Sequence, residues 1–205
     1  PYSKVLDEWN RLSRALLVER GQLDPQRFIE TIGVVCQDNS VSIKLGAQND
    51  AGEFLSKLLE FLHEATAAKV DMKVNGQVST DKDKIAETCY NSFKKEYEDK
   101  FSPVIDLFNG ISIGGMSEPH GGAIASTLVP AMFNTLTLPL PMMQANVALK
   151  DCFSSYCQDT LLKGDNSWFD ETLGAKREVV RWTRFWSLPK VLIIEFPRRA
   201  MPALF

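Results

Sequence analysis

Polar side chains with carboxylate and carboxamide groups crowd the start of one predicted helix, over 48–64. Gln48, Asn49 and Asp50 precede its apolar face, and Glu53 follows within the first turn. Asp50 is placed to cap the backbone N–H groups of that turn, and Glu53, three residues later, completes a capping box. A capping carboxylate keeps lone pairs for a further partner, and arginine pairs with it strongly. The cluster is therefore a helix cap, with or without a cationic ligand.

Cysteine and histidine could supply a nucleophile and its base, as a cysteine protease requires. The cysteines are Cys36, Cys89, Cys152 and Cys157, and the histidines are His63 and His120. Neither Cys36 nor Cys89 has a histidine nearby in the sequence, so a pair would have to assemble through space. The apolar surroundings favour small buried thiols, and the histidines suit surface or capping positions. No catalytic residue is assigned within 1–205.

A structural zinc site needs four Cys or His ligands, usually from two Cys-x-x-Cys pairs. Cys152 and Cys157 lie five positions apart on a predicted helix, which points the thiols away from a common face. Scattered cysteines are typical of reduced thiols rather than of disulfides, and they predict a reducing intracellular compartment, cytoplasmic or nuclear. No metal or other cofactor is expected.

The first half of the chain is predicted to be mainly helical. Apolar residues recur there at helical spacing, and the second helix begins with Asp24 as cap and Pro25 at the first helical position. The predicted helices cover 2–19 (ended by Gly21), 25–33 (ended by Gly33), 48–64 and 80–100, with a later one at 147–162. The first three, joined by short connections, predict a compact helical lobe.

Strand patterns dominate the second half. Alternating and β-branched runs predict strands at 101–110, 133–141, 176–186 and 188–196, the last of them buried. Asn75-Gly76 predicts a hairpin turn within 70–78, and the glycine-rich stretch 114–122 predicts an exposed loop. The chain is therefore assigned to the α+β class.

Composition limits the classes of function. The 205 residues are 44% hydrophobic, enough for one good core with a lobe beside it. A net charge of −3 and an isoelectric point of about 5.5 give no sign of a nucleic-acid partner. No apolar run approaches ~20 residues, so no membrane span is expected, and no leader sequence is visible at Pro1.

Several motifs, in collinear order, resemble those of one protein family. Gln-Asn-Asp-Ala-Gly-Glu-Phe at 48–54 resembles the Gln-Gln-Asp-Ala-x-Glu-Phe box of the ubiquitin-specific proteases, which are papain-like cysteine deubiquitinases. Further matches are Asp-Leu-Phe-x-Gly within 101–110, Phe-x-x-Leu-x-Leu-Pro at 133–139, the segments 149–153 and 161–169, and Leu-Pro-x-Val-Leu-Ile-Ile at 188–194, followed by Arg198 and Arg199. The resemblance spans residues 1–199.

The resemblance implies a papain-like domain with a helical thumb at 1–100 and a β palm-and-fingers region at 101–205. The chain would then be the middle part of a catalytic domain that hydrolyses the isopeptide bond after the C-terminal glycine of ubiquitin. The resemblance puts the catalytic cysteine upstream of Pro1 and the histidine beyond Phe205. We therefore expect this polypeptide alone to be inactive.

The same resemblance assigns a binding role to the cluster at the start of the 48–64 helix. Gln48, Asp50 and Glu53 would lie beside the cleft for the extended ubiquitin tail, and the two carboxylates would pair with the two arginines of that tail. Ubiquitin or a ubiquitinated protein is thus the expected partner. The alternative is a catalytically inactive member that serves as a structural or scaffolding subunit of a larger assembly.

Zinc is a further expectation that the resemblance raises, because the family often carries two Cys-x-x-Cys pairs in its fingers. The first region, 111–122, has no cysteine, and Asp170 and Leu173 stand where the second pair would fall. The fingers are therefore expected to keep their shape through packing alone. A dense aromatic set is expected to pack against the sheet, with part of it as an alternative surface for the ubiquitin globule. Its members are Trp168, Phe169, Trp182, Phe185 and Trp186.

Overall fold

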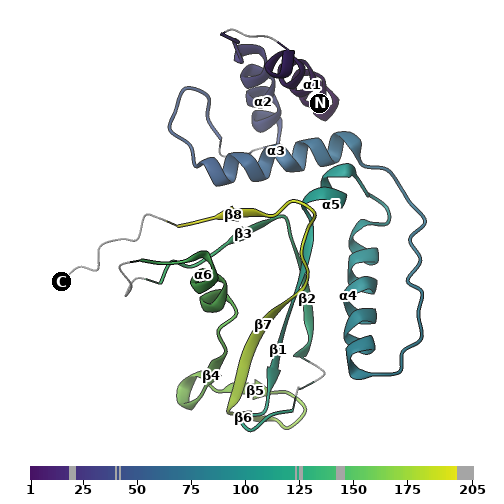
Figure 1. Ribbon diagram of the computed structural model, residues 1–205, viewed down its shortest axis with the longest axis vertical. Coiled ribbons are helices and arrows are strands. Elements are labelled where there is room, and N and C mark those ends of the chain that lie inside the picture. Colours follow the sequence, from purple (N-terminus) through teal and green to yellow (C-terminus); the bar gives the residue numbers. More distant parts are fainter. Residues whose placement is uncertain are drawn as a thin grey trace, which may run out of the picture. The chain divides into compact units, whose positions relative to one another are not determined.

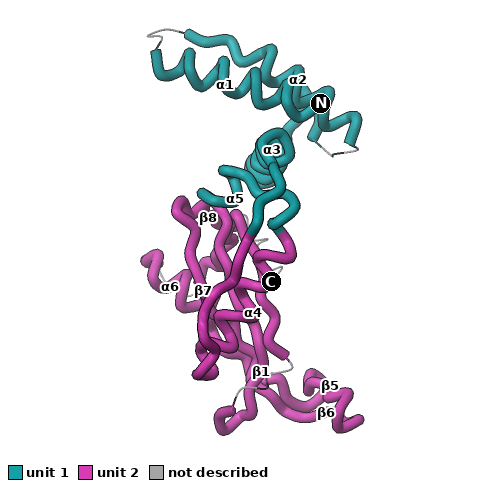
Figure 2. Tube along the Cα trace, turned by 90° about the vertical axis from the view of Figure 1, so that its right-hand side faces the viewer, with its two compact units in different colours: residues 1–71, 97–107 teal, residues 72–96, 108–205 magenta. Residues whose placement is uncertain are grey.

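The computed structural model describes residues 1–18, 22–39, 41, 43–122, 124, 127–141 and 146–197 of the chain (Figure 1). Helices and sheets are both present, so the α+β class is confirmed. The chain divides into two compact units, which Figure 2 distinguishes by colour. Unit 1 comprises residues 1–71 and 97–107, and unit 2 comprises 72–96 and 108–205. The two units are defined by how compactly the chain is packed, which does not test the predicted thumb at 1–100 or the palm-and-fingers region at 101–205. Both therefore stay predictions.

Two sequence expectations concern the limits of this description. The predicted helix end at Gly21 and the basic pair Arg198 and Arg199 lie outside the described residues. Within the described ranges, no helix combines the length and the apolar character that a membrane span needs.

Unit 1 is mainly helical. Its helices are α1 (Tyr2–Val18), α2 (Gln26–Asp38), α3 (Ala51–Thr66) and the short α5 (Pro103–Phe108). The sequence placed the cap of α2 at Asp24 and its first residue at Pro25, but Pro25 is the N-cap residue and the helix begins at Gln26. Asp24 still binds the helix start, since its Oδ1 accepts a hydrogen bond from the Gln26 N–H at 2.9 Å. The prediction that Gly33 ends this helix was wrong. Gly33 lies on the buried face of a continuous α2, where an added Cβ would collide with the Leu45 side chain, so the glycine serves close packing.

The helices α1, α2 and α3 pack around one apolar core. Its buried members are Val5, Phe28, Ile32, Val35, Cys36, Ile43, Leu58 and Phe61. Two ring contacts join the helices: Tyr2 stacks on Phe61 with centroids 5.6 Å apart, and Trp9 meets Phe28 at 5.8 Å. Full burial of one such side chain is worth about 1.5–3 kcal/mol, against about 1 kcal/mol for a cap. The core therefore dominates the stability of this unit.

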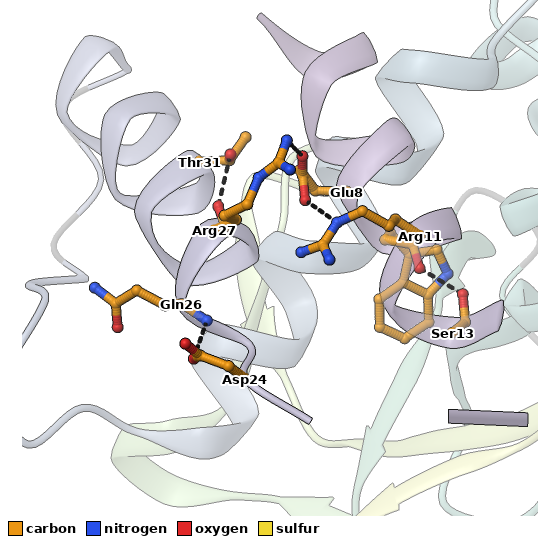
Figure 3. A network of polar contacts seen from close by, with 8 residues as sticks. Glu8, Arg11, Ser13, Asp24, Gln26, Arg27 and Thr31 are labelled. Carbon is orange, nitrogen blue, oxygen red and sulfur yellow. Dashed lines mark hydrogen bonds and ion pairs between the residues drawn. The ribbon is translucent and has the colours of Figure 1, made fainter. Parts of the chain in front are cut away.

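Glu8 links α1 to α2 through two ion pairs (Figure 3). One carboxylate oxygen lies 2.7 Å from Arg11 Nε, and the other lies 2.6 Å from Arg27 Nη2. The Glu8 side chain is 14% exposed, so these charge-assisted hydrogen bonds replace most of the water around its carboxylate. The hydrogen bond from Arg11 is the largest cause that lowers the pKa of Glu8, and Arg27 acts in the same direction.

The strand predicted over 101–110 was wrong for most of its length. Residues 103–108 form α5, and strand β1 begins only at Gly110. Ser102 starts this helix, because its Oγ accepts a hydrogen bond from the Ile105 N–H at 3.3 Å, and Pro103 occupies the first helical position. Ser-Pro is a helix-start signal that the following β-branched residues obscured.

Among its described residues, unit 2 contains a four-stranded antiparallel sheet, in the order β2-β1-β7-β4, and two strand pairs. The strands of the large sheet are β1 (Gly110–Ser117), β2 (Val129–Phe133), β4 (Thr160–Leu162) and β7 (Val179–Ser187). The other strands are β3 (Thr135–Thr137), parallel to β8 (Ile193–Glu195), and β5 (Trp168–Asp170), antiparallel to β6 (Ala175–Arg177). The helices are α4 (Asp81–Tyr97), α6 (Leu149–Tyr156) and the 3₁₀ turn η2 (Gly164–Asn166).

The helices α4 and α6 cover opposite faces of the large sheet (Figure 1). On one face, Cys89 of α4 belongs to a cluster with Trp182 and Trp186 of β7. On the other face, Tyr156 of α6 stacks on Phe185 with ring centroids 5.4 Å apart. Side chains at positions 182 and 186 share a strand face that position 185 does not. The prediction that the aromatic set packs against the sheet is confirmed for Trp182, Phe185 and Trp186, whereas Phe169 is 52% exposed.

The exposed loop predicted over 114–122 was wrong for its first part, because β1 runs through Ser117. Gly115 is buried in this strand, and a Cβ there would lie 2.7 Å from Cζ2 of Trp182 on the neighbouring β7. The glycine that suggested a loop makes room for the indole ring instead.

The remaining differences concern where elements end. Residues 70–78 form no strand, so the hairpin predicted there was wrong. The helix predicted over 147–162 ends at Tyr156, and residues 160–162 pair with β7 as β4. The strand predicted over 133–141 is divided between β2 and β3. The strand predicted over 188–196 is limited to β8, which is half-buried rather than buried and pairs with β3 alone among the described residues.

Arg177 holds the hairpin of β5 and β6, in the region predicted as fingers. Its Nη2 lies 2.9 Å from Asp170 Oδ2, and its Nη1 lies 2.7 Å from Glu118 Oε1. The guanidinium also lies over the Trp168 ring, 5.3 Å from the centroid. Asp170, whose side chain is 8% exposed, accepts a further hydrogen bond from the Thr172 N–H at 2.9 Å. Packing alone was therefore an incomplete prediction, because ion pairs cross-link this hairpin.

Replacing Glu8 by Gln should lower the free energy of unfolding at pH 7, because both ion pairs lose their negative partner. A carboxylate with a lowered folded-state pKa stabilises the protein above its ordinary value of 4.5, and the effect is lost as the pH falls through the lower folded value. The difference between wild type and Glu8→Gln should therefore shrink in acid, as urea unfolding from pH 7 downward would measure.

Glu60→Gln is the matched control for Glu8→Gln. Glu60 is 51% exposed and pairs only on the surface with Lys57, so its loss should change the free energy of unfolding little. Equal stability of wild type and Glu8→Gln at pH 7 would contradict the role given to Glu8.

Arg177→Met should lower the free energy of unfolding by about 3 kcal/mol, because it leaves the buried Asp170 carboxylate without its counter-ion. The double variant Arg177→Met, Asp170→Asn should recover part of that loss, since no buried charge then remains. Chemical denaturation measures both values. Arg184→Met is the control: its partner Asp159 is 49% exposed, so the change should cost less than about 1 kcal/mol. Equal costs for the two single variants would refute a special role for Arg177.

Candidate functional site at the start of α3

The first turn of α3 is capped as the sequence predicted. Asp50 is the N-cap residue, with φ −76° and ψ 130°, and its Oδ1 accepts a hydrogen bond from the Glu53 N–H at 3.0 Å. The Phe54 N–H donates to the Asp50 carbonyl, also at 3.0 Å, and so begins the helical hydrogen-bond pattern. The Asp50 half of the predicted capping box is therefore confirmed, and a second carboxylate, that of Glu53, lies within the first turn.

The cluster is accessible while the helix that carries it is anchored. Gln48, Asp50 and Glu53 are all exposed. Further along α3, Leu58 and Phe61 are buried in the core of unit 1. The predicted apolar face of the helix thus fixes its position, and the polar residues at its start stay in contact with solvent. Sequence proximity and the helix start bring the three predicted site residues together at one place.

Asn49 is a residue of this site that the sequence analysis gave no role. Its Oδ1 accepts a hydrogen bond from the Lys44 N–H at 3.0 Å, and its Nδ2 donates to the Lys44 and Ala47 carbonyls at 2.9 and 3.0 Å. The loop that it contacts turns through Gly46, whose φ of 73° is a left-handed conformation that favours glycine. Asparagine beside a Gly-containing turn was the available signal, since Asn side chains bind nearby backbone groups.

The side chains of the cluster suit hydrogen bonding and ion pairing rather than bond breaking. It offers carboxylate oxygens that accept hydrogen bonds from cationic groups, and a Gln48 carboxamide that can both donate and accept. No thiol, hydroxyl or imidazole belongs to it.

Cys36 and Cys89, which the sequence predicted to be buried, lie in environments that disfavour nucleophilic catalysis. Cys36 lies in the core of unit 1 and Cys89 in the core between α4 and the sheet, both fully buried. Burial raises the pKa of both thiols, which disfavours the reactive thiolate. His63 bonds Ser102 instead, with Nδ1 2.8 Å from Oγ, and His120 is exposed in a turn. The interpretation of Cys36 and Cys89 as buried structural thiols is confirmed.

Asp170 and Leu173, which stand where the family's second zinc-binding pair would fall, are not surrounded by metal-ligating side chains among the described residues. The part of the chain that the structure describes has no group of three or more His, Cys, Asp or Glu side chains arranged to hold a metal ion. Asp170 is paired with Arg177, and Leu173 is exposed. Cys152 is buried in the core beside α6, and Cys157 follows the end of that helix.

Comparison with known proteins adds evidence that is independent of this geometry. The family model described as ubiquitin carboxyl-terminal hydrolase matches residues 2–202. The chain is 23% identical over 203 residues to probable ubiquitin carboxyl-terminal hydrolase 4 of Schizosaccharomyces pombe, a match that covers 95% of this chain and 33% of that protein. It is 27% identical over 114 residues to probable ubiquitin carboxyl-terminal hydrolase R319 of Acanthamoeba polyphaga mimivirus, which covers 55% of this chain and 24% of that protein.

The chain therefore spans about a third or less of the length of these relatives. The family match, in contrast, extends over nearly the whole chain and agrees with the resemblance carried by the 48–54 box. The chain thus belongs to the ubiquitin carboxyl-terminal hydrolase family, of the ubiquitin-specific protease type.

Proposed function

We propose that this chain is the ubiquitin-recognising part of a deubiquitinase, and that Gln48, Asp50 and Glu53 bind the C-terminal tail of ubiquitin. The observation that carries the proposal is the pair of exposed carboxylates at the start of α3, within the box that resembles the family motif. The whole protein would hydrolyse the isopeptide bond after the C-terminal glycine of ubiquitin in a reducing intracellular compartment. The papain-like thumb, palm and fingers are part of the same proposal.

The energies favour a cationic ligand at this helix start because carboxylates are present there. The N-terminus of a helix carries a partial positive charge, which repels a cation by about 0.3–1 kcal/mol. A hydrogen bond between a guanidinium and a carboxylate is worth about 1.5–3 kcal/mol, so even one such bond exceeds the repulsion. Asp50 uses Oδ1 for its cap, and its second oxygen would accept from an arginine of the tail.

Hydrolysis itself would need a thiolate and a histidine base. The buried Cys36 and Cys89, with their raised pKa values, do not suit this role. The proposal therefore gives this chain recognition and leaves the catalytic cysteine and histidine to other parts of the protein.

A second candidate is an inactive member that serves as a structural or scaffolding subunit. The ion pairs of Arg177 favour it to a limited extent, because a stabilised hairpin at the predicted fingers suits a structural part. Incubation of the full-length protein with a fluorogenic ubiquitin C-terminal substrate separates the candidates. Hydrolysis supports the deubiquitinase, whereas tail binding without hydrolysis supports the scaffold.

The double variant Asp50→Asn, Glu53→Gln should bind ubiquitin at least about 100-fold more weakly than wild type, because two charge-assisted hydrogen bonds are lost. Asparagine is itself a good N-cap residue, so α3 should keep its start. Calorimetric titration of the full-length protein with ubiquitin measures the change, after circular dichroism has verified the fold.

Glu60→Gln, which removes an exposed carboxylate further along α3, is the control and should bind as wild type does. Unchanged affinity of the double variant would exclude this cluster as the tail site.

A further inference from the structure

Asn49 makes a contact that only a carboxamide side chain can make. It meets Lys44 on both backbone groups, accepting from the N–H and donating to the C=O, and it donates a further hydrogen bond to the Ala47 C=O. An asparagine provides both a donor and an acceptor, whereas a carboxylate only accepts and an alanine does neither. The three distances, between 2.9 and 3.0 Å, are those of well-formed hydrogen bonds.

These hydrogen bonds tie the 44–47 loop to Asn49, which directly precedes the N-cap of α3. Within the loop, the Ala47 N–H donates to the Lys44 C=O at 3.3 Å, which forms a turn through Gly46. Asn49, the residue that precedes the N-cap, binds both ends of that turn through its side chain, and we call this set of three hydrogen bonds the Asn49 latch. Gln48 lies between two fixed points, since its neighbour Ala47 is held by Asn49 and the following cap is held by α3.

We propose that Asn49 is a positioning residue for the tail site, which fixes the backbone on which Gln48 and Asp50 are presented. This inference rests on the proposed function. A loop that is already ordered loses less conformational entropy when a ligand binds, so the latch should raise affinity without touching the ligand. Asn49 thus contributes to recognition although its own polar atoms are engaged with the loop.

Asn49→Asp tests the inference, because a positioning role and a purely electrostatic site predict opposite changes in ubiquitin affinity. The substitution keeps the size of the side chain, but it places carboxylate oxygens against the carbonyl oxygens of Lys44 and Ala47 and so opens the latch. It also adds a negative charge beside Asp50 and Glu53, which by charge alone would strengthen binding of an arginine-bearing tail. A positioning role predicts that Asn49→Asp binds ubiquitin about tenfold more weakly. A purely electrostatic site predicts tighter binding.

Asn39→Asp is the matched control, because it makes the same chemical change elsewhere in unit 1. The Asn39 side chain also donates to one carbonyl, that of Val35 at 2.7 Å, and accepts from the Tyr2 hydroxyl at 3.0 Å. Its replacement reports the cost of a lost asparagine contact to folding, measured by thermal unfolding. Ubiquitin affinity of the folded Asn39→Asp protein should equal that of wild type.

The latch is also measurable without a ligand. In Asn49→Ala the Lys44 amide loses its acceptor, so its hydrogen exchange, followed by NMR in the full-length protein, should become at least about tenfold faster while amides in the middle of α3 keep their rates. An unchanged Lys44 amide would overturn the latch, even if Asn49→Asp proved too unstable to titrate.

The binding outcomes separate this inference from the function on which it rests. If wild type binds ubiquitin and Asn49→Asp binds equally or more tightly, the positioning role is overturned and the tail site stands. If wild type shows no binding, the proposed function fails and the role of Asn49 in recognition fails with it. Three results together establish the positioning role: Asn49→Asp binds ubiquitin more weakly, the Lys44 amide of Asn49→Ala exchanges faster, and Asn39→Asp binds ubiquitin as wild type does.

Discussion

Helix α3 has to bury one face in the core of unit 1 and keep its first turn in solvent. The buried Leu58 and Phe61 each contribute about 1.5–3 kcal/mol, whereas the Asp50 cap contributes about 1 kcal/mol. Core packing therefore decides where the helix lies, and the cap decides where it begins. Everything proposed for the site depends on this division, because carboxylates on a helix without an anchored face would have no defined position.

The same burial that stabilises the two units makes the thiols of Cys36 and Cys89 poor nucleophiles. Cys36 and Cys89 are small apolar side chains in well-packed cores, and loss of water raises their pKa values. A catalytic thiol needs the opposite, namely partial exposure and a nearby positive group. The two roles exclude each other physically, so Cys36 and Cys89 serve packing.

The hairpin of β5 and β6 is stabilised by ion pairs more than by apolar burial. Two strands of three residues bury little apolar surface, and such a hairpin is marginal without further support. Arg177 supplies that support by pairing with Asp170 and Glu118 and by lying over Trp168. The buried carboxylate makes this arrangement sensitive to the loss of either partner, which explains why one arginine can matter more here than an exposed ion pair elsewhere.

The sequence by itself determined the elements whose signals are local. The periodic helices α1, α3 and α4, the cap at Asp50 and the family box at 48–54 all lie within short windows, and their signals are read without knowledge of the rest of the chain. Only the tertiary structure decided the rest. Gly115 lies in a strand because Trp182 of another strand needs its space, and Arg177 reaches Glu118 across 59 positions. The Asn49 latch is local in sequence, yet its bonds require a loop geometry that residue types alone did not specify. Contacts between distant residues, and the backbone path of loops, follow from packing rather than from periodicity, and packing is settled only when the whole unit is folded.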